Sequence, residues 1–117
     1  MARILLADDD LDVRLVMEHI LIDGGYKVDA TETELGGREL LGSCHYDLVV
    51  ADGRMPDGTG MELADQAQEE GTPALIVTGY AFELLKDDLD RFEFLLKPVR
   101  PHELLEAVER ALQTEDK

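Results

Sequence analysis

The stretch "DLVVADGRMPDGTG", residues 47–60, decides the fold. It begins with an apolar run that has the composition of a buried strand, and an acidic residue, Asp52, follows this run directly. A carboxylate at the exit of a buried strand is unfavourable unless a partner or a cation compensates its charge. We expect Pro56 to stiffen the loop that follows, and Gly58 and Gly60 to let that loop turn into a helix without a Cβ clash.

Short apolar runs alternate along the chain with segments of helical periodicity. The runs predict strands over 3–7, 26–30, 47–51, 74–78 and 92–96. The helical segments are 11–23, 33–42, 58–70, 81–90 and 101–113. The apolar spacing places Val16 on the buried face of the first helix and Leu35 on the buried face of the second. Thr33 is expected to cap the second helix, and Gly24–Gly25 to end the first.

Strict alternation of strand and helix predicts a parallel sheet that helices cover on both faces. The continuous apolar strands agree, because a parallel sheet is buried on both sides. With five strands and right-handed crossovers, we expect the order 2-1-3-4-5 of a doubly wound, flavodoxin-like α/β fold. One such unit accounts for residues 1–117, so a single domain is expected.

Composition and charge exclude several classes of function. The net charge is -16, from 27 acidic and 11 basic residues. Such an acidic surface repels phosphate backbones and anionic lipid, so we expect no direct binding to nucleic acid or to a membrane. No run approaches the roughly 20 apolar residues of a membrane helix, and the first residues do not have the pattern of a signal peptide. With one cysteine, which allows no internal disulfide, the chain fits a reducing compartment, and we expect a cytoplasmic protein.

Charged and hydroxyl side chains gather at the carboxyl ends of the expected strands. They are Asp8 and Asp9 after the first strand, Asp52 after the third, Thr78 at the end of the fourth and Lys97 after the fifth. Because the first and third strands are neighbours in the expected order, their carboxylates must lie close together. Carboxylates this close do not all ionise cheaply without a cation, and Mg2+ is the hard divalent ion that fits best. A carboxylate nucleophile, a divalent metal, a lysine and a hydroxyl together indicate phosphoryl transfer.

At these positions the sequence resembles the receiver domain of two-component response regulators, of the chemotaxis-regulator type. The matching segments are "ILLADDD", "DLVVADGRMPDGTGMEL", "ALIVTGY" and "FLLKPVRPHELLEAV", each at a strand end. The resemblance implies that Asp52 accepts a phosphoryl group from a histidine kinase or a histidine phosphotransfer protein. It implies a signalling domain rather than a dedicated enzyme, a monomer or weak dimer that switches conformation to control the binding of a downstream protein.

The resemblance also implies roles for single residues at the metal site. Asp8, Asp9 and Asp52 would bind Mg2+, for which Mn2+ can substitute. The backbone carbonyl of Arg54 would complete the set of protein ligands.

The resemblance further implies a conformational switch. Thr78 and Lys97 would contact the phosphoryl group, and Thr78 with Phe94 would form the switch. The bond before Pro98 would be cis and would orient Lys97. Two features depart from the family: the switch aromatic is not tyrosine, which leaves a switch by burial, and the segment between Thr78 and Lys97 is shorter by about one helical turn. We therefore expect the helix over 81–90 to be short, shifted or mobile, and the use of the common dimerisation face stays open.

Two large residues bear on the lifetime of the phosphorylated state. In receivers, the residues two positions after the phosphoacceptor and two after the switch hydroxyl flank the path of the hydrolytic water. Here they are Arg54 and Tyr80. Our hypothesis is that they shield the phosphoryl group and slow its loss; the alternative is that both side chains point to solvent.

Other classes of protein remain as alternatives. The "DDD" at 8–10 contains an Asp-x-Asp pattern, as in haloacid dehalogenase-like phosphatases, where the first aspartate is the nucleophile and the second a general acid. That scheme gives Asp52 no role, and the chain is short for a core with a cap. A pseudo-receiver that only binds partners is a further class, against which the intact acidic set argues. Whether the chain is a stand-alone receiver or part of a longer regulator or hybrid kinase also stays open.

Several reactive residue types receive structural interpretations. Asp10 is expected as an acid at the N-terminus of the first helix, where the helix dipole favours it, rather than as a metal ligand. His19, His45 and His102 lack the spacing of metal ligands and are expected at the surface. Cys44 is expected as a small buried side chain.

Overall fold

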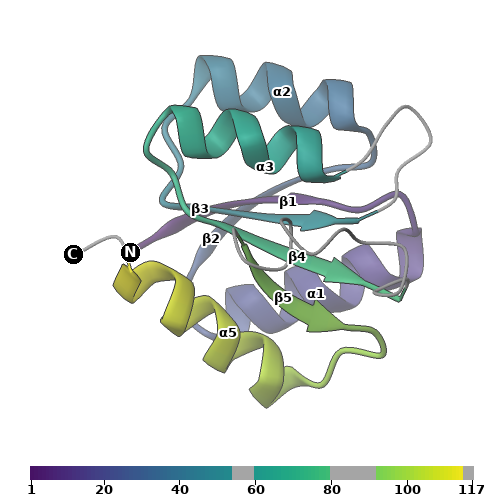
Figure 1. Cartoon of the computed structure of the whole chain (residues 1–117). Helices are drawn as coiled ribbons and strands as arrows, with labels where there is room; N and C mark the ends of the chain where they lie inside the picture. Colours follow the sequence, from purple (N-terminus) through teal and green to yellow (C-terminus); the bar gives the residue numbers. More distant parts are fainter. Residues whose placement is uncertain (54–59, 80–91, 115–117) are drawn as a thin grey trace.

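The computed structural model describes residues 1–53, 60–79 and 92–114. A five-stranded parallel sheet with the order β2-β1-β3-β4-β5 forms its centre, which confirms the predicted fold class (Figure 1). The strands are β1 (Arg3–Ala7), β2 (Lys27–Thr31), β3 (Leu48–Asp52), β4 (Ala74–Thr78) and β5 (Glu93–Leu96). The helices are α1 (Leu11–Asp23), α2 (Glu34–Ser43), α3 (Gly60–Glu69) and α5 (Pro101–Thr114). The helix expected over 81–90 lies outside the described residues.

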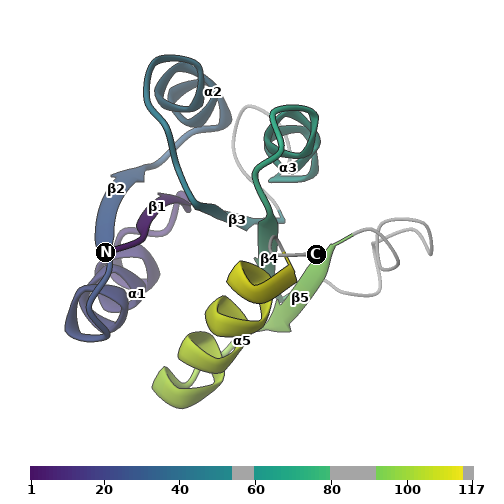
Figure 2. The same ribbon diagram turned by 90° about the vertical axis from the view of Figure 1, so that its left-hand side faces the viewer.

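Helices cover both faces of the sheet, with α1 and α5 on one side and α2 and α3 on the other (Figures 1 and 2). Side chains of β1 alternate between the two layers because successive residues of a strand point to opposite faces. Ile4 and Leu6 pack in the core beneath α1 and α5, whereas Leu5 and Ala7 pack beneath α2 and α3. All four are fully buried, as a central parallel strand requires.

The expected helix boundaries are close to the observed ones. Asp10 caps α1 by accepting a hydrogen bond from the Val13 amide, and Gly24 ends that helix. Thr33 caps α2, since its hydroxyl accepts a hydrogen bond from the Gly36 amide. These caps were predicted from residue type, because short polar side chains satisfy the free amides of a first turn. None of the helices within the described parts of the chain has the length and apolar character needed to cross a bilayer.

The expectation that Leu35 points inward is wrong, because this side chain is 60% exposed. The inner face of α2 instead runs through Glu34, Gly37 and Leu41. Gly37 sets this orientation, since a Cβ at that position would come within 2.8 Å of the Leu63 side chain of α3. The two helices are therefore in close contact at a position where only a glycine fits without repacking.

Buried Glu34 is stabilised by an ion pair that also joins the two helices. Arg38 donates to Glu34 at 2.7 Å and to Glu62 of α3 at 2.9 Å. Burial raises the pKa of Glu34, and the neighbouring Arg38 opposes that change. Glu34, paired with Arg38, thus lies on the buried face of α2, where the apolar pattern predicted Leu35.

The expectation that Val16 is buried is also wrong, because it is 56% exposed. Met17, Ile20 and Leu21 form the buried face of α1, and Val13 packs against them. Successive residues of a helix are about 100° apart, so a broad apolar stripe can include Val16 or stop beside it, and the pattern alone does not decide which. Packing against α5 selects the row that contains Leu21.

Candidate functional site

The carboxyl ends of β1 and β3 lie side by side and bring three aspartates together. The two strands pair in parallel with Ala7 opposite Ala51, so Asp8 and Asp52 follow at the same level of the sheet. One carboxylate oxygen from each of Asp8, Asp9 and Asp52 lies within 4.8 Å of the other two. Asp8 and Asp52 are buried, whereas Asp9 is exposed. These three residues define the acidic site.

Hydrogen bonds hold Asp8 in one orientation within this site. Its backbone amide donates to the Thr31 carbonyl at 3.0 Å, and its Oδ1 accepts a hydrogen bond from the Asp10 amide at 2.9 Å. Its second oxygen, Oδ2, is buried and has no hydrogen-bond partner within the described parts of the chain. Buried polar atoms are almost always satisfied, so an unsatisfied carboxylate oxygen indicates a place for a ligand.

Lys97, which follows β5, supplies positive charge to the acidic site. Its Nζ donates to Asp52 Oδ2 at 3.2 Å, and it lies 3.2 Å from Asp8 Oδ2 as an ion pair that is not aligned for a hydrogen bond. Burial by itself lowers the pKa of the Lys97 ammonium, but attraction to Asp52 and Asp8 outweighs this effect and raises the pKa. Lys97 therefore remains charged at neutral pH.

The donor set of the acidic site fits a hard divalent cation. Within residues 1–53, 60–79 and 92–114, Lys97 is the ammonium that pairs with these carboxylates, and it contacts Asp8 and Asp52 at a partly buried position. Carboxylate oxygens are the ligands that Mg2+ prefers, and Asp8 Oδ2, which is ion-paired with Lys97 but accepts no hydrogen bond within the described residues, supplies one of them. Asp8, Asp9 and Asp52 could therefore hold Mg2+. The carbonyl of Arg54, expected as a further ligand, lies outside the described residues.

Thr78 ends β4 beside the acidic site and is 1% exposed. Its carbonyl accepts a hydrogen bond from the Lys97 amide at 3.0 Å, which fixes the ends of β4 and β5 together. A Cβ at Gly53 would lie 3.0 Å from the Thr78 hydroxyl oxygen, so the residue after Asp52 leaves room for that hydroxyl. Phe94, the expected switch aromatic, is half-buried on β5 and packs against the core beneath α2 and α3.

Gly60 begins α3 directly against the backbone of Asp52. A Cβ at this position would overlap the Asp52 carbonyl oxygen, so the prediction that Gly60 avoids a clash is confirmed. The other two residues expected to shape this loop, Pro56 and Gly58, lie outside the described residues. The close contact fixes the start of α3 relative to the acidic site.

The chain is similar to known proteins both in its sequence and in its fold. Residues 4–109 match the family profile of the response regulator receiver domain. The chain belongs to this family. The receiver is 36% identical over 118 residues to the response regulator protein PilR of Pseudomonas aeruginosa, an alignment that covers 93% of this chain and 26% of PilR. It thus spans about a quarter of the length of that relative.

Other relatives of this receiver are similar in size to the chain itself. The response regulator receiver protein CpdR of Brucella abortus is 32% identical over 117 residues, which cover 96% of this chain and 98% of CpdR. The crystal structure of the response regulator TrrA of Thermotoga maritima, in complex with Mg2+ and BeF, superposes with a TM-score of 0.86 at 27% identity. That alignment covers 95% of this chain and 99% of TrrA. The match identifies a domain of two-component signalling.

Of the remaining sequence predictions for this receiver, some are confirmed, one is wrong and two concern residues that the structure does not describe. The peptide bond between Lys97 and Pro98 is cis. Asp10 caps α1 and does not belong to the acidic site. Cys44 is half-buried, whereas a buried side chain was expected. The histidines, His19, His45 and His102, are exposed as expected. Arg54 and Tyr80, for which a role in dephosphorylation was expected, lie outside the described residues.

One residue close to the acidic site of the receiver was not expected from the sequence. Arg14 of α1 donates from its Nη1 to the backbone carbonyl of Asp8 at 2.9 Å. A basic residue one turn after the acidic run "DDD" is the only signal of this contact in the sequence. Such a signal is weak, because an arginine on a helix more often covers a solvated face.

Proposed function

We propose that Asp52 is the phosphoacceptor of this receiver and that Mg2+ binds at the acidic site. The observation that carries the proposal is the convergence of the Asp8, Asp9 and Asp52 carboxylates, one of whose buried oxygens, Asp8 Oδ2, has an ion pair with Lys97 but no hydrogen bond within the described residues. TrrA, a related receiver, has been crystallised in complex with Mg2+ and BeF, which supports the same cation here.

The proposed reaction transfers a phosphoryl group from a phosphohistidine to Asp52. A carboxylate oxygen of Asp52 attacks phosphorus, an O–P bond forms, and the N–P bond breaks as the imidazole leaves with the electron pair and takes up a proton. Lys97 and the Thr78 hydroxyl stand at the edge of the site where they would donate to the phosphoryl oxygens. Bound Mg2+ would neutralise part of the charge on those oxygens.

The donor in this proposal is a histidine kinase or a histidine phosphotransfer protein, whose phosphohistidine must reach Asp52. The helix α1, which begins beside the acidic site, exposes Leu11 and Leu15 in its first two turns, each by more than half. A pocket of about 260 Å³ adjoins it, lined by Asp12, Val13, Val16, Met17, Lys97, Pro98 and Val99. An exposed apolar surface next to the reacting carboxylate supports docking of the donor protein on α1.

We further propose that phosphorylation moves Thr78 toward the phosphoryl group and changes the burial of Phe94. A ligand shifts such an equilibrium only through its different affinity for the two states. Thr78→Ala should still be phosphorylated but should lose the switch. Fluorine NMR on a labelled Phe94, with and without beryllofluoride, should show a change of environment; an unchanged signal contradicts the switch.

The test of the proposed function is phosphorylation by acetyl phosphate in Mg2+, followed by the mass of the intact protein. We expect one phosphoryl group on the wild type and none on Asp52→Asn. Retained phosphorylation of Asp52→Asn would contradict the proposal. Release of phosphate that survives in Asp52→Asn but not in Asp8→Asn would instead indicate a phosphatase with Asp8 as nucleophile.

A further inference from the structure

The turn between β1 and α1 carries two of the three aspartates of the acidic site, and one side chain of α1 reaches back to it. Arg14 is half-buried and donates from Nη1 to the Asp8 carbonyl at 2.9 Å. Its own backbone amide donates to the Asp10 carbonyl at 2.8 Å. Arg14 is therefore anchored in the first turn of α1 and holds the residue that precedes this turn.

The contact bears on the orientation of the Asp8 carboxylate. The Asp8 Oδ1 accepts from the Asp10 amide at 2.9 Å, and Asp10 in turn caps α1 through the Val13 amide at 3.1 Å. Rotation of the peptide that follows Asp8 would break the first of these bonds, because that peptide sets the direction of the chain toward Asp10. Arg14 restrains this peptide through its carbonyl.

We propose that Arg14 is a positioning residue of the cation site. By restraining the Asp8 carbonyl, it keeps Oδ1 on the Asp10 amide and leaves the unsatisfied Oδ2 directed to the cation. The inference rests on the proposed function, since it concerns the same site. Partners of metal ligands commonly act in this way, by fixing the direction of a ligand atom that they do not themselves contribute.

Two effects of Arg14 on cation affinity have opposite signs, which makes the proposal testable. Its positive charge near the acidic site repels a cation, so removal of the charge alone would strengthen Mg2+ binding. Its hydrogen bond orders a ligand, so loss of the bond would weaken Mg2+ binding. The proposal states that the ordering effect is the larger of the two.

The experiment compares Arg14→Met, Arg14→Lys and the control Arg110→Met. Arg110 pairs with Glu93 between α5 and β5, so its replacement removes the same charge without a contact to the β1–α1 turn. Mg2+ affinity is measured by calorimetric titration, and hydrogen exchange at the Asp10 amide is followed by NMR in the metal-free protein. For Arg14→Met we expect Mg2+ affinity to fall on the order of tenfold, with faster exchange at Asp10.

Arg14→Lys should recover part of the affinity, because its ammonium keeps the charge and can donate a hydrogen bond but lacks the planar guanidinium. Arg110→Met should bind Mg2+ at least as tightly as the wild type and should leave exchange at Asp10 unchanged. If Arg14→Met binds Mg2+ as tightly as the wild type or more tightly, Arg14 acts only through its charge, and the proposal is overturned. If Arg14→Met does not fold, Arg14→Ala takes its place, and wild-type Mg2+ affinity and Asp10 exchange in that variant would overturn the proposal.

Exchange at Asp10 needs neither a metal nor a phosphoryl group. A failure of the proposed function, seen as phosphorylation that survives in Asp52→Asn, would therefore leave this measurement intact. Conversely, if hydrogen exchange at the Asp10 amide is unchanged in Arg14→Met, the positioning role is contradicted even where Asp52 is confirmed as the phosphoacceptor.

Discussion

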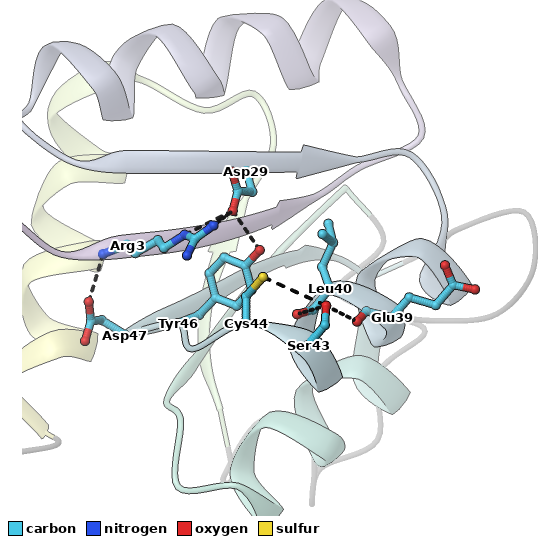
Figure 3. Close-up of polar contacts among 8 residues, drawn as sticks. All are labelled: Arg3, Asp29, Glu39, Leu40, Ser43, Cys44, Tyr46 and Asp47. Atoms are coloured by element: carbon cyan, nitrogen blue, oxygen red, sulfur yellow. Dashed lines mark hydrogen bonds and ion pairs between the residues drawn. The ribbon is translucent and has the colours of Figure 1, made fainter.

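A polar cluster lies toward each end of the sheet. We call the amino-end cluster closed, because its carboxylate is matched by hydrogen-bond donors, and the carboxyl-end cluster open, because one carboxylate oxygen accepts no hydrogen bond within the described residues. In the amino-end cluster, Asp29 of β2 accepts hydrogen bonds from the Tyr46 hydroxyl at 2.8 Å and from the Arg3 guanidinium at 2.6 and 3.1 Å (Figure 3). The Arg3 guanidinium also lies over the Tyr46 ring, 5.1 Å from its centroid. In the carboxyl-end cluster, formed by the acidic site and Lys97, the Lys97 ammonium pairs with both Asp8 and Asp52, and Asp9 lies beside them.

The two clusters differ in how their charges are matched. The Tyr46 hydroxyl, together with Arg3, holds the pKa of Asp29 below its ordinary value against the effect of burial. Burial, followed by the hydrogen bond to Asp29, raises the pKa of Tyr46 and keeps its hydroxyl a donor. At the other end, Asp8 Oδ2 has an ion pair with Lys97 at 3.2 Å but accepts no hydrogen bond within the described residues. The half-buried Asp29 carboxylate, with matched donors, stabilises the fold, whereas the buried Asp8 oxygen without a hydrogen-bond donor indicates a place for a ligand.

The largest effect is expected from Gly60→Ala, which adds a methyl group at the carboxyl end. The new Cβ would overlap the Asp52 carbonyl, so α3 or the end of β3 must shift. We expect a loss of about 3 kcal/mol in the free energy of unfolding, the upper end of the cost of overpacking. Gly42→Ala is the control, because nothing lies within 4 Å of a Cβ at that position of α2. Urea denaturation should show equal or higher stability for the control; an unaffected Gly60→Ala would contradict the close contact.

Next in size is Lys97→Met, which removes the cation from the carboxyl-end cluster. Without metal, the variant should lose about 2 kcal/mol of stability, less than for a fully buried pair because Lys97 is partly exposed. Added Mg2+ should restore more stability to the variant than it adds to the wild type, since it replaces the missing charge. Thermal unfolding with and without Mg2+ measures both, with Lys27→Met at an exposed position of β2 as the control. A cost that Mg2+ does not reduce would show that Lys97 stabilises the protein by packing instead.

A smaller effect is expected from Tyr46→Phe, which opens the closed amino-end cluster. Loss of the hydroxyl donor to Asp29 should lower the free energy of unfolding by about 1–1.5 kcal/mol. Because the folded pKa of Asp29 lies below its unfolded value, its contribution is present above that value, about 3.9, and is lost as the pH falls through the folded pKa.

The difference between wild type and Tyr46→Phe should therefore narrow below about pH 4. Urea denaturation at pH 7 and pH 3 tests this, with Tyr26→Phe as a variant that removes a hydroxyl outside the cluster. A difference that stays constant over this range would mean that the hydroxyl does not act through the Asp29 charge. Mg2+ should not change the difference at either pH, because this cluster is closed.

The smallest effect on stability is expected from Asp9→Asn at the exposed corner of the acidic site. Relief of repulsion among the carboxylates should raise the stability of the metal-free protein by under about 1 kcal/mol, since exposed charges interact weakly. Mg2+ binding should weaken at the same time. A lower melting temperature without metal, combined with unchanged Mg2+ affinity, would remove Asp9 from the proposed ligands.

The sequence alone was sufficient for the fold and for the convergence of the acidic site. Alternation of apolar runs and helical segments fixes a doubly wound parallel sheet, because few topologies remain once crossovers are short and right-handed. That strand order makes β1 and β3 neighbours, so Asp8 and Asp52 meet by topology alone. The caps Asp10 and Thr33 were equally predictable, because they act on amides within their own first turn.

Only the tertiary structure decided which side chains meet across elements. Tyr46 and Arg3 reach Asp29 over 17 and 26 residues of sequence, and such partners depend on register and side-chain direction, which local patterns do not encode. The inward turn of Glu34 in place of Leu35 likewise depends on the close contact of α2 with α3. The bond from Arg14 to the Asp8 carbonyl belongs to the same class, since a backbone acceptor carries no residue type that a sequence could reveal.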